Sequence, residues 1–454
     1  MGRPRASTAL GLWMNGQHVG RWEVSARGEH RLSYAPAWID APLGRPVSLS
    51  MPLRPADAPY TGEVVRNFFE NLLPDNTAIR QRIARQFGTT TEAFGLLAEI
   101  GRDCVGALQL LPEGQTPDDT AAVRAEPLSD AQVEAHLARQ RSAPTFGADE
   151  ENTFRISLAG AQEKSAFLWH DGAWCRPLGS TPTTHIFKLP LGQVPGGIDL
   201  STSVENEWLC LRLLAAFGVP VAESQLLRFG QQRVLSVTRF DRRRSAQGRW
   251  LRLPQEDFAQ VFGIDPNLKY ESHGGPGVRD ILDRLLGATE PAADRADFFR
   301  SQVLFWMLAA IDGHAKNFSV FIEPRGRYRL TPRYDVLSAY PVMGHGAGQL
   351  SPHKIKMAMA VWGRNRHYRW SEMRRAHFEQ TAADCRVPDA AAIIDALVAR
   401  TPQAIADVSA ALPEGFPRRW PRRCSTASPA PRRRWRWAER SRAYLCAIAF
   451  LVNR

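Results

Sequence analysis

An aspartate and an asparagine stand five positions apart, Asp312 and Asn317, in a polar stretch that follows the apolar run 303–311. In protein kinases a catalytic loop with this spacing places Asp to accept the proton of a substrate hydroxyl and Asn to hold Mg²⁺. A second carboxylate, Asp335, follows one expected hairpin later, where a kinase keeps its main metal-binding Asp. Magnesium is usually bound through one or two protein oxygens together with water and phosphate. The three residues therefore predict phosphoryl transfer from ATP with Mg²⁺.

The same residue types have a second interpretation. Asp, Gly and Asn favour turns in any protein, so an Asp-x-x-x-x-Asn match is also found in ordinary loops. The choice depends on whether the rest of the chain supplies the other parts of a phosphoryl-transfer site.

A candidate phosphate loop lies earlier in the chain. Strands expected over 154–158 and 165–169 flank the small-residue turn 159–164, and this layout lets backbone N–H groups approach a polyphosphate. A plain hairpin with one glycine has the same pattern. Lys188 stands alone among apolar residues in an expected strand over 184–190. It is either a phosphate-binding lysine or an edge residue with its ammonium group in water.

Two further segments extend the comparison with kinases. The expected helix 204–217 carries Glu205 and Glu207. Either one of them, with Glu207 favoured, pairs with Lys188, or both belong to a solvated helix face. The expected strand 234–242 stands where a kinase hinge holds adenine through backbone groups. His314 has no second His or Cys at metal-ligand spacing, so we expect it to order the loop around Asp312 rather than to bind a metal.

Hydrophobic patterning predicts a mixture of strands and helices. Residues 9–35 alternate apolar and polar around a turn at Asn15-Gly16, which indicates a small antiparallel sheet, and 47–53 is expected to continue it. Buried strands are expected at 104–112 and 318–322. Helices are expected at 68–74, 79–87 (capped by Asp75 or Asn76), 93–100, 129–139, 255–262, 278–286, 295–311 and 390–397.

Length and composition bound the class of protein. A chain of 454 residues exceeds what one hydrophobic core usually serves, so two or three subdomains are expected. With 44% hydrophobic and 23% charged residues, and no run of about 18 apolar residues, we expect a soluble protein without a membrane partner. The N-terminus lacks a signal peptide pattern. Six scattered cysteines without paired spacing indicate a reducing cytoplasm and argue against a zinc site.

The positive charge is concentrated at the C-terminus. Residues 417–454 hold eleven Arg and one Glu, a net charge of +10, so about +2 of the total of +12 remains for the first 416 residues. This distribution weakens the nucleic-acid interpretation that +12 would otherwise favour. A second basic cluster, Arg364 to Arg375, is either a solvated face or a surface that meets phosphates.

Taken together, several segments resemble the HipA family, serine/threonine kinases that act as toxins of type II toxin-antitoxin pairs. The resemblance spans about residues 9–416, and its motifs occur in the order found in the family. The segments that carry it are 65–74, 157–164, 183–190, 253–257, 312–319 and 334–335.

The resemblance implies an α+β, protein-kinase-like bilobal fold with a mixed α/β N-terminal module and a mainly helical C-terminal lobe. It also implies a division of the chain. The expected parts are an N-terminal α/β module (1–112), a linker with one helix (113–150), a kinase N-lobe with the phosphate loop (151–242), a helical C-lobe with the catalytic and metal loops (243–416), and an atypical Arg/Trp-rich tail (417–454).

The resemblance further implies the roles of individual residues, with ATP and Mg²⁺ as cofactors. Asp312 is the catalytic base, Asn317 and Asp335 hold metal, and Lys188 binds the α- and β-phosphates. The remaining nucleotide-binding positions are Ala159, Gly160, Ala161, Gln162, Glu163 and Lys164 in the phosphate loop, Thr238, Arg239 and Phe240 in the hinge, and His314 and Tyr334 around the nucleotide, together with Asn317 and Asp335.

Regulation and partners are also implied by the resemblance. Autophosphorylation is expected at Ser157, and a phosphate there adds about −1.5 to −2 charge beside a loop that must accept an anionic nucleotide, which should eject the loop. The expected protein substrate is glutamyl-tRNA synthetase, whose inhibition would stop translation and promote dormancy. The expected partners are a HipB-like helix-turn-helix antitoxin and, through that complex, operator DNA.

Two other functions stay open, and so does the origin of the tail. The basic tail and the 364–375 cluster would suit a DNA-associated co-repressor without enzyme activity, and the loop residues alone also fit a small-molecule kinase. The tail departs from the family after Pro417, where relatives continue as an ordinary helix. Its bias toward Arg, Trp, Pro, Ser and Cys indicates either a GC-rich gene translated out of frame or a nucleic-acid-binding arm.

Overall fold

The computed structural model describes residues 9–118, 123–141, 162 and 164–416, and the chain divides into two compact units. Unit 1 comprises Met1–Leu189, Leu227–Lys269 and Ser319–Arg329, and unit 2 comprises Pro190–Leu226, Tyr270–Phe318 and Leu330–Arg454. Each unit therefore combines segments that are far apart in the sequence.

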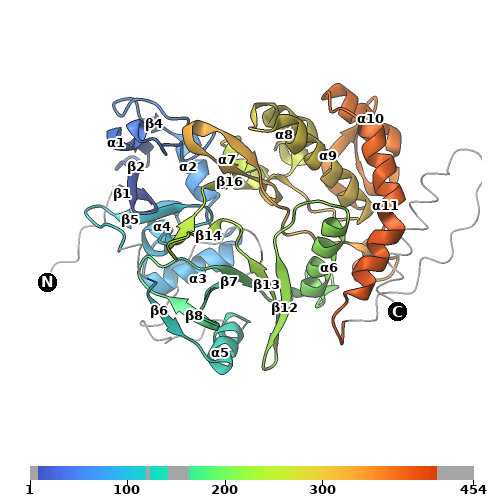
Figure 1. Ribbon diagram of the computed structural model, residues 1–454, viewed down its shortest axis with the longest axis horizontal. Coiled ribbons are helices and arrows are strands. Elements are labelled where there is room, and N and C mark those ends of the chain that lie inside the picture. The colour runs from blue at the N-terminus through green and yellow to red at the C-terminus, as the bar shows by residue number, and fades with distance from the viewer. Residues whose placement is uncertain (1–8, 119–122, 142–161, 163, 417–454) are drawn as a thin grey trace, which may run out of the picture. The chain divides into compact units, whose positions relative to one another are not determined.

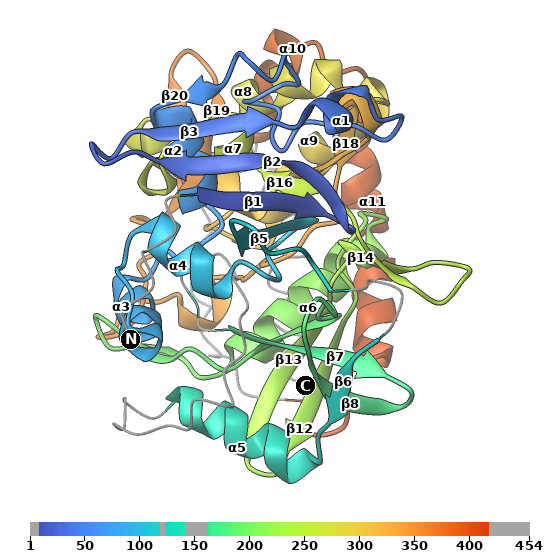
Figure 2. The same ribbon diagram turned by 90° about the vertical axis from the view of Figure 1, so that its left-hand side faces the viewer.

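Unit 1 begins with the small antiparallel sheet that the alternation over 9–35 predicts (Figure 2). Asn15 and Gly16 both adopt positive φ, 49° and 82°, as a two-residue hairpin turn requires. The strand order is β4-β3-β2-β1-β5. The strands are β1 (Ala9–Met14), β2 (Gln17–Val24), β3 (His30–Tyr34), β4 (Tyr60–Thr61) and β5 (Leu108–Pro112).

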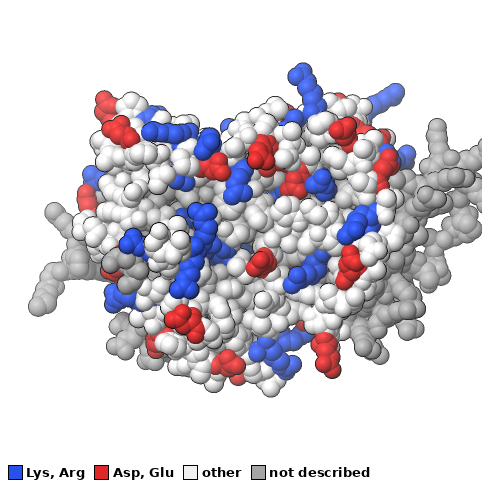
Figure 3. Space-filling model, viewed as in Figure 1, with Lys and Arg blue, Asp and Glu red and all other residues white. Residues whose placement is uncertain are grey.

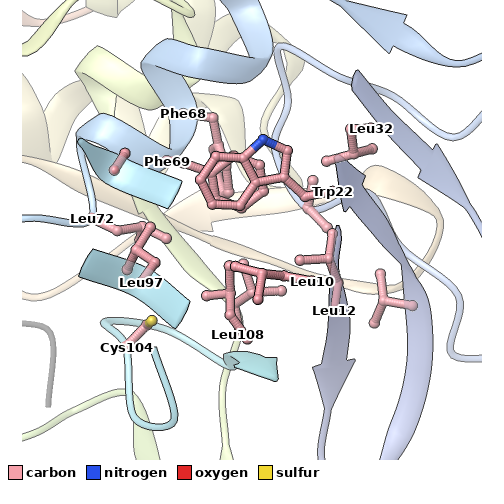
Figure 4. Close-up of a cluster of buried hydrophobic side chains, with 14 of the residues drawn as sticks. Leu10, Leu12, Trp22, Leu32, Phe68, Phe69, Leu72, Leu97, Cys104 and Leu108 are labelled. Atoms are coloured by element: carbon pink, nitrogen blue, oxygen red, sulfur yellow. The ribbon is translucent and has the colours of Figure 1, made fainter. Parts of the chain in front are cut away.

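Helices α1, α2 and α4 contact this sheet, α3 packs against α4, and together they close a hydrophobic core. Trp22 of β2 stacks on Phe69 with ring centroids 3.7 Å apart, and Leu10 and Leu97 lie beside them (Figure 4). The predicted helix 93–100 is confirmed. Asn76 is the N-cap of the third helix, where its side chain accepts hydrogen bonds from two backbone N–H groups. The helices are α1 (Pro36–Asp40), α2 (Glu63–Glu70), α3 (Thr77–Phe87) and α4 (Ala93–Ile100).

A second sheet of unit 1 has the strand order β12-β13-β9-β7-β8-β6. Helix α5 (Asp130–Arg141) packs Val133 and Leu137 against Phe167 and Phe187 of this sheet. The strands expected around 165–169, 184–190 and 234–242 form, although the last ends at Thr238, and the one expected at 154–158 lies outside the described residues. The strands are β6 (Ala125–Pro127), β7 (Lys164–His170), β8 (Ala173–Pro177), β9 (His185–Lys188), β12 (Ser224–Phe229) and β13 (Gln232–Thr238).

Two expected elements of unit 1 are displaced: the helix expected at 68–74 is α2, which ends at Glu70, and the strand expected at 104–112 begins only at Leu108. Two further expectations for unit 1 are wrong in kind. Residues 47–53 turn rather than extend, because the Tyr34 hydroxyl accepts the Val47 N–H (2.9 Å) and donates to the Met51 carbonyl (2.6 Å). The expected helix 255–262 is divided into β16 (Gln255–Asp257), which pairs with β17 (Ser319–Ile322), and α7 (Phe258–Val261). The remaining elements of this region are β14 (Arg242–Arg244), β15 (Trp250–Arg252), η2 (Pro266–Leu268), η6 (Pro324–Gly326) and β18 (Tyr328–Leu330).

Residues of the segments 65–74 and 253–257 help to join the N-terminal sheet and its helices to the rest of unit 1. Asn67 and Asn71 of the 65–74 segment donate to the carbonyls of Gly263 and Ile264, each at 2.9 Å. The Leu49 N–H donates to the Glu256 carboxylate at 2.7 Å. Two of the segments that carry the family resemblance, 65–74 and 253–257, therefore contribute to a structural joint.

A buried ion network makes a second joint in unit 1. The Asp103 carboxylate lies 3.2 Å from Arg239 Nη1, 2.9 Å from Arg242 Nη2 and 3.1 Å from Arg252 Nε. Asp241 accepts from Arg239 at 2.8 Å and from the Gly106 N–H at 2.7 Å. All four charged side chains around Asp103 are nearly inaccessible, so their charges must satisfy one another.

Unit 2 is mainly helical (Figure 1). Its longest helix, α11 (Ala390–Ala410), extends well beyond the expected 390–397 and packs against α6, α9 and α10. No described helix is long and apolar enough to cross a membrane. The other elements are β10 (Gly192–Val194), β11 (Ile198–Leu200), α6 (Ser203–Ala216), η3 (Glu271–His273), α8 (Val278–Arg284), η4 (Leu285–Gly287), α9 (Pro291–Met307), η5 (Ala315–Asn317), η7 (Tyr340–Val342), β19 (Lys356–Trp362), β20 (Arg366–Arg369), η8 (Trp370–Glu372) and α10 (Arg375–Asp384).

Candidate active site

The loop that carries Asp312 follows the C-terminal end of α9. The apolar run continues to Ile311, but the helix ends at Met307 because Ala309 takes a left-handed conformation, φ 49°. The N–H of Ala309 then donates to the Trp306 carbonyl and the N–H of Ala310 to the Phe305 carbonyl, which is a Schellman termination. The expected helix 295–311 is therefore wrong at its end, and Asp312 follows a short non-helical link.

Gly313 allows the loop to turn against α9. A Cβ at this position would lie 2.5 Å from Cδ2 of the buried Phe305 ring. The His314 N–H donates to the Asp312 carbonyl at 2.8 Å, and the Asn317 N–H donates to the His314 carbonyl at 2.9 Å. Asp312 and Asn317 are thereby held in one tight loop, with Asp312 exposed and Asn317 buried.

Asn317 connects this loop to Asp335. Its Nδ2 donates to the Asp335 carbonyl at 3.0 Å, while its buried Oδ1 has no hydrogen-bond partner in the described part of the chain. The Tyr334 hydroxyl donates to the Lys316 carbonyl at 2.9 Å, a second tie between the same two segments. A buried amide oxygen without a donor is a position where a hard cation such as Mg²⁺ would compensate the desolvation of the group.

Asp335 is held in an unfavourable conformation by a side chain of α6. Its φ is 57°, in the left-handed region that costs a residue with a Cβ about 1–2 kcal/mol. The Asp335 N–H donates to Oε1 of Glu207 at 3.2 Å, and Glu207 is only 2% exposed. Glu207, which the sequence suggested as a partner for Lys188, thus orders the segment around Asp335 in unit 2.

Neighbouring contacts fix the segment that follows Asp335. The Asn206 side chain donates to the Ser338 carbonyl at 2.8 Å and accepts the Ser338 N–H at 3.0 Å. The Ser338 hydroxyl donates to the Leu308 carbonyl at 2.6 Å, at the end of α9. On the other side, Arg333 is fully buried, donates to Ser301 of α9 at 2.9 Å and pairs with Asp297. Helices α6 and α9 therefore position Asp335 from both directions.

Tyr270 is a residue of this site that sequence reasoning missed. Its hydroxyl donates to Oδ1 of Asp312 at 2.6 Å, and its ring lies edge-on to His314 with centroids 5.0 Å apart. Tyr270 stands 42 residues before Asp312, so no local spacing could reveal the contact.

The predicted site residues of unit 1 lie on its second sheet. Lys164 and Lys188 are direct cross-strand partners of β7 and β9, so their side chains leave the same face. Gln162 donates from Nε2 to the Leu189 carbonyl at 2.7 Å. Two ammonium groups at adjacent positions of one face can contact the same anionic ligand, such as a phosphate.

The expected hinge residues lie at the end of β13, which includes Thr238, and directly after it. The Arg239 N–H donates to the Thr184 carbonyl at 2.8 Å, and the guanidinium group of Arg239 is used in the Asp103 network. Phe240 packs edge-on against Phe321 with centroids 5.7 Å apart. Thr238 and Phe240 are half-buried. The Arg239 side chain is buried in the Asp103 network. Arg239 could therefore bind a nucleotide only through its backbone groups.

The predicted residues therefore fall into two groups. Asp312, His314, Asn317, Tyr334 and Asp335 are brought together in unit 2, whereas Gln162, Lys164, Lys188, Thr238, Arg239 and Phe240 belong to unit 1. The predicted positions Ser157, Ala159, Gly160, Ala161 and Glu163, and the tail 417–454, lie outside the described residues.

A metal at this site would depend on few protein ligands. Among the described residues no group of three His, Cys, Asp or Glu side chains could hold a metal ion. Magnesium needs only one or two protein oxygens beside water and phosphate, and the Asn317 amide and the Asp335 carboxylate supply that donor set. The described cysteines, Cys104, Cys175, Cys210 and Cys385, are buried and free.

Comparison with known proteins assigns this chain to a family. A family profile described as HipA-like C-terminal domain matches residues 156–405, and another described as HipA N-terminal domain matches residues 10–111. The chain belongs to the HipA family. The segments that resembled this family in the sequence lie within or at the edges of the two matched regions.

Individual relatives agree with this assignment. The putative kinase Y4mE of Sinorhizobium fredii is 34% identical over 359 residues, which are 78% of this chain and 80% of that protein. The serine/threonine-protein kinase toxin HipA of Shewanella oneidensis is 29% identical over 311 residues, 65% of this chain and 67% of that protein. The chain is thus a HipA-family kinase, as the loop residues and the resemblance predict.

A solved structure supports the fold. HipA from the complex of Shewanella oneidensis HipA, HipB and operator DNA matches with a TM-score of 0.73 at 22% identity, covering 98% of this chain and 96% of that one. The predicted α+β, protein-kinase-like fold is confirmed by this match.

Proposed function

We propose that this HipA-family chain is an ATP- and Mg²⁺-dependent serine/threonine protein kinase that acts as the toxin of a toxin-antitoxin pair. The observation that carries the proposal is the bridge from Asn317 to Asp335, with a buried amide oxygen of Asn317 left for a cation. The bridge joins the loop of the proposed base, Asp312, to the proposed metal-binding aspartate.

Each residue has a chemical task in this proposal. Asp312 accepts the proton of the serine or threonine hydroxyl of the substrate, which is the task of the catalytic-loop Asp in kinases. Asn317 and Asp335 hold Mg²⁺, which when bound neutralises charge on the transferred phosphate. Lys188, together with Lys164, binds the nucleotide phosphates, since both project from one face of the sheet.

The other proposed positions would complete the nucleotide-binding residues. Thr238, Arg239 and Phe240 form the adenine hinge, and His314 and Tyr334 line the nucleotide. The remaining phosphate loop comprises Ala159, Gly160, Ala161, Gln162 and Glu163. Phosphorylation of Ser157 would place about −1.5 to −2 charge next to this loop, so the phosphorylated protein should bind ATP more weakly than the unmodified one.

The proposal includes partners by analogy with the relative whose complex is known. The Shewanella oneidensis structure holds HipA, HipB and operator DNA, so we propose a HipB-like antitoxin and operator DNA as partners of this chain. Glutamyl-tRNA synthetase is the proposed protein substrate. The proposed functional division is the one drawn from the sequence: module 1–112, linker 113–150, N-lobe 151–242 and C-lobe 243–416.

Transfer of labelled phosphate tests the proposal. Wild type should phosphorylate glutamyl-tRNA synthetase from ATP only when Mg²⁺ is present, and Asp312→Ala should lose at least about a hundredfold in rate because the general base is gone. Asp57→Asn, an exposed aspartate of unit 1, is the matched control and should transfer normally. Undiminished transfer by Asp312→Ala would remove Asp312 from the mechanism.

A DNA-associated co-repressor without kinase activity has less support. In the 364–375 cluster, Arg366, Arg369 and Arg375 each have a carboxylate partner, and acidic side chains lie among the basic ones on the face in Figure 3. The co-repressor predicts DNA binding by the chain alone that falls steeply with salt. Loss of all DNA binding without an antitoxin would reject it.

A further inference from the structure

The hydroxyl of Tyr270 donates a hydrogen bond of 2.6 Å to Oδ1 of Asp312. We propose that Tyr270 is a positioning residue for phosphoryl transfer, which holds the Asp312 carboxylate in the orientation that accepts the substrate proton. This inference rests on the proposed function, because Tyr270 has such a role only if Asp312 is the base.

The ring of Tyr270 is fixed by the same loop that it serves. It lies edge-on to His314, with centroids 5.0 Å apart and planes at 87°, and His273 contacts it at 5.5 Å. The His314 N–H in turn donates to the Asp312 carbonyl. Tyr270, His314 and Asp312 therefore form a closed set of contacts, in which moving one residue displaces the other two.

The backbone of Tyr270 is anchored as well. Its carbonyl accepts hydrogen bonds from the N–H groups of His273 and Gly275, both at 3.0 Å, which closes the turn after it. The next side chain, Glu271, is 8% exposed, and its carboxylate accepts the Ala360 N–H of β19 at 2.6 Å. The segment that carries Tyr270 is thus fastened to β19.

The same strand also holds the segment that carries Asp312. The Ala358 N–H of β19 donates to the Ile311 carbonyl at 2.9 Å, one residue before Asp312. Two positions of one strand, Ala358 and Ala360, therefore set the spacing between the phenol and the carboxylate. A hydrogen bond built on a shared rigid strand is preorganised, so its geometry does not depend on either loop alone.

An exposed aspartate needs such a restraint. Asp312 is solvent-exposed, and without a partner its carboxylate would rotate among several staggered conformations. A hydrogen bond to a charged acceptor is worth enough to favour one conformation, and misorientation of a catalytic group lowers the rate. Removing the phenol hydroxyl should therefore lower kcat by about tenfold to a hundredfold.

The first test compares two Tyr→Phe variants in the full chain with ATP, Mg²⁺ and a protein acceptor. Tyr270→Phe should lower kcat by about tenfold or more with the KM for ATP within about twofold of wild type. Tyr340→Phe is the control, since the Tyr340 hydroxyl donates to the Met307 carbonyl at 3.1 Å in the same unit; it should leave kcat unchanged. Equal kcat for Tyr270→Phe and wild type would overturn the inference.

The second test separates this inference from the proposed function. If Tyr270 acts through Asp312, adding Tyr270→Phe to Asp312→Ala should not lower the residual transfer rate further. An equal loss in both backgrounds would overturn the positioning role while leaving the base role intact. Full activity of Asp312→Ala would overturn the base role and the inference with it. Thermal unfolding midpoints of all variants show whether a loss of rate reflects a loss of folded protein.

Discussion

Glu207 shows how a single residue can be assigned two roles. The sequence suggests that it pairs with Lys188, as a charged partner, whereas in the structure its Oε1 accepts the N–H of Asp335 at 3.2 Å. The second role needs an oxygen acceptor but not a negative charge. It also explains how Asp335 keeps a left-handed φ of 57° without being glycine, because a partly buried hydrogen bond can offset a strain of about 1–2 kcal/mol.

Substitution of Glu207 distinguishes the two roles. Glu207→Gln keeps an acceptor oxygen for the Asp335 N–H, so we expect kcat within about threefold of wild type. Glu207→Ala leaves that partly buried N–H without its acceptor and should lower kcat by about tenfold or more, with a cost in stability of about 1 kcal/mol. Rates are compared at saturating ATP and Mg²⁺. If Glu207→Gln is as impaired as Glu207→Ala, the negative charge matters and the Lys188 pair is favoured.

At the scale of elements, local pattern predicted those helices and strands whose signals are local. The helix over 93–100 has an apolar spacing of its own, with Ala93, Leu96, Leu97 and Ile100 buried, and the 204–217 pattern matches α6 to within one residue at each end. The helix expected at 255–262 failed because β16 pairs with β17, more than sixty residues later in the chain. No local signal shows which remote strand will compete for the backbone hydrogen bonds of a segment.

The candidate site likewise combines residues that local spacing predicts with contacts that it does not. Asp312 and Asn317 share one loop, and Asp335 follows closely, so their spacing alone suggests one site. The link between them, the Asn317 amide on the Asp335 carbonyl, and the phenol of Tyr270 on Asp312 are tertiary contacts. Residue type does not specify such contacts, because tyrosine hydroxyls and asparagine amides find partners in most folds.

The junction of α9 with the loop that carries Asp312 depends on the absence of one side-chain carbon. At Gly313 an added Cβ would meet the ring of Phe305, which is 2% exposed and cannot move freely. We expect Gly313→Ala to destabilise the protein by about 1–3 kcal/mol through overpacking and to lower kcat by displacing Asp312. Urea unfolding and transfer rates measure the two effects.

A second substitution tests whether the contact with Phe305 causes the destabilisation. Phe305→Leu replaces the obstructing ring by a smaller side chain, so the double variant Gly313→Ala/Phe305→Leu should be less destabilised than the sum of the single variants. Additive effects would show that the contact with Phe305 is not the cause.

For the whole molecule, the Asp103 network joins the N-terminal module to the segment that contains the proposed hinge, and both belong to unit 1. Burial alone would raise the pKa of the Asp103 carboxyl, but Arg242, Arg239 and Arg252 around it hold that pKa below its ordinary value. Thr183 adds hydrogen bonds from its N–H and its hydroxyl. The carboxylate is thus stabilised in its charged form by groups of a different segment.

The sign of the pH dependence follows from the lowered pKa. Asp103 binds its proton less readily when folded than when unfolded, where its pKa is about 3.9. Its contribution to stability is therefore fully present above about pH 4 and is lost as the pH falls further toward the folded pKa. Acid should loosen the joint between the N-terminal module and the hinge segment before it protonates the network completely.

Asp103→Asn tests both the size and the origin of this contribution. At pH 7 the variant leaves three buried guanidinium groups with Asp241 as the remaining carboxylate of the network, so we expect a loss of about 3–5 kcal/mol in the free energy of unfolding. The difference from wild type should begin to shrink below about pH 4, because Asp103 of the unfolded wild-type chain takes up a proton there while folded Asp103 stays charged. Denaturant unfolding at pH 7 and at about pH 3 measures this, with Asp57→Asn as the exposed control. A loss that is equal at both pH values would mean that packing, rather than charge, makes Asp103 necessary for the joint.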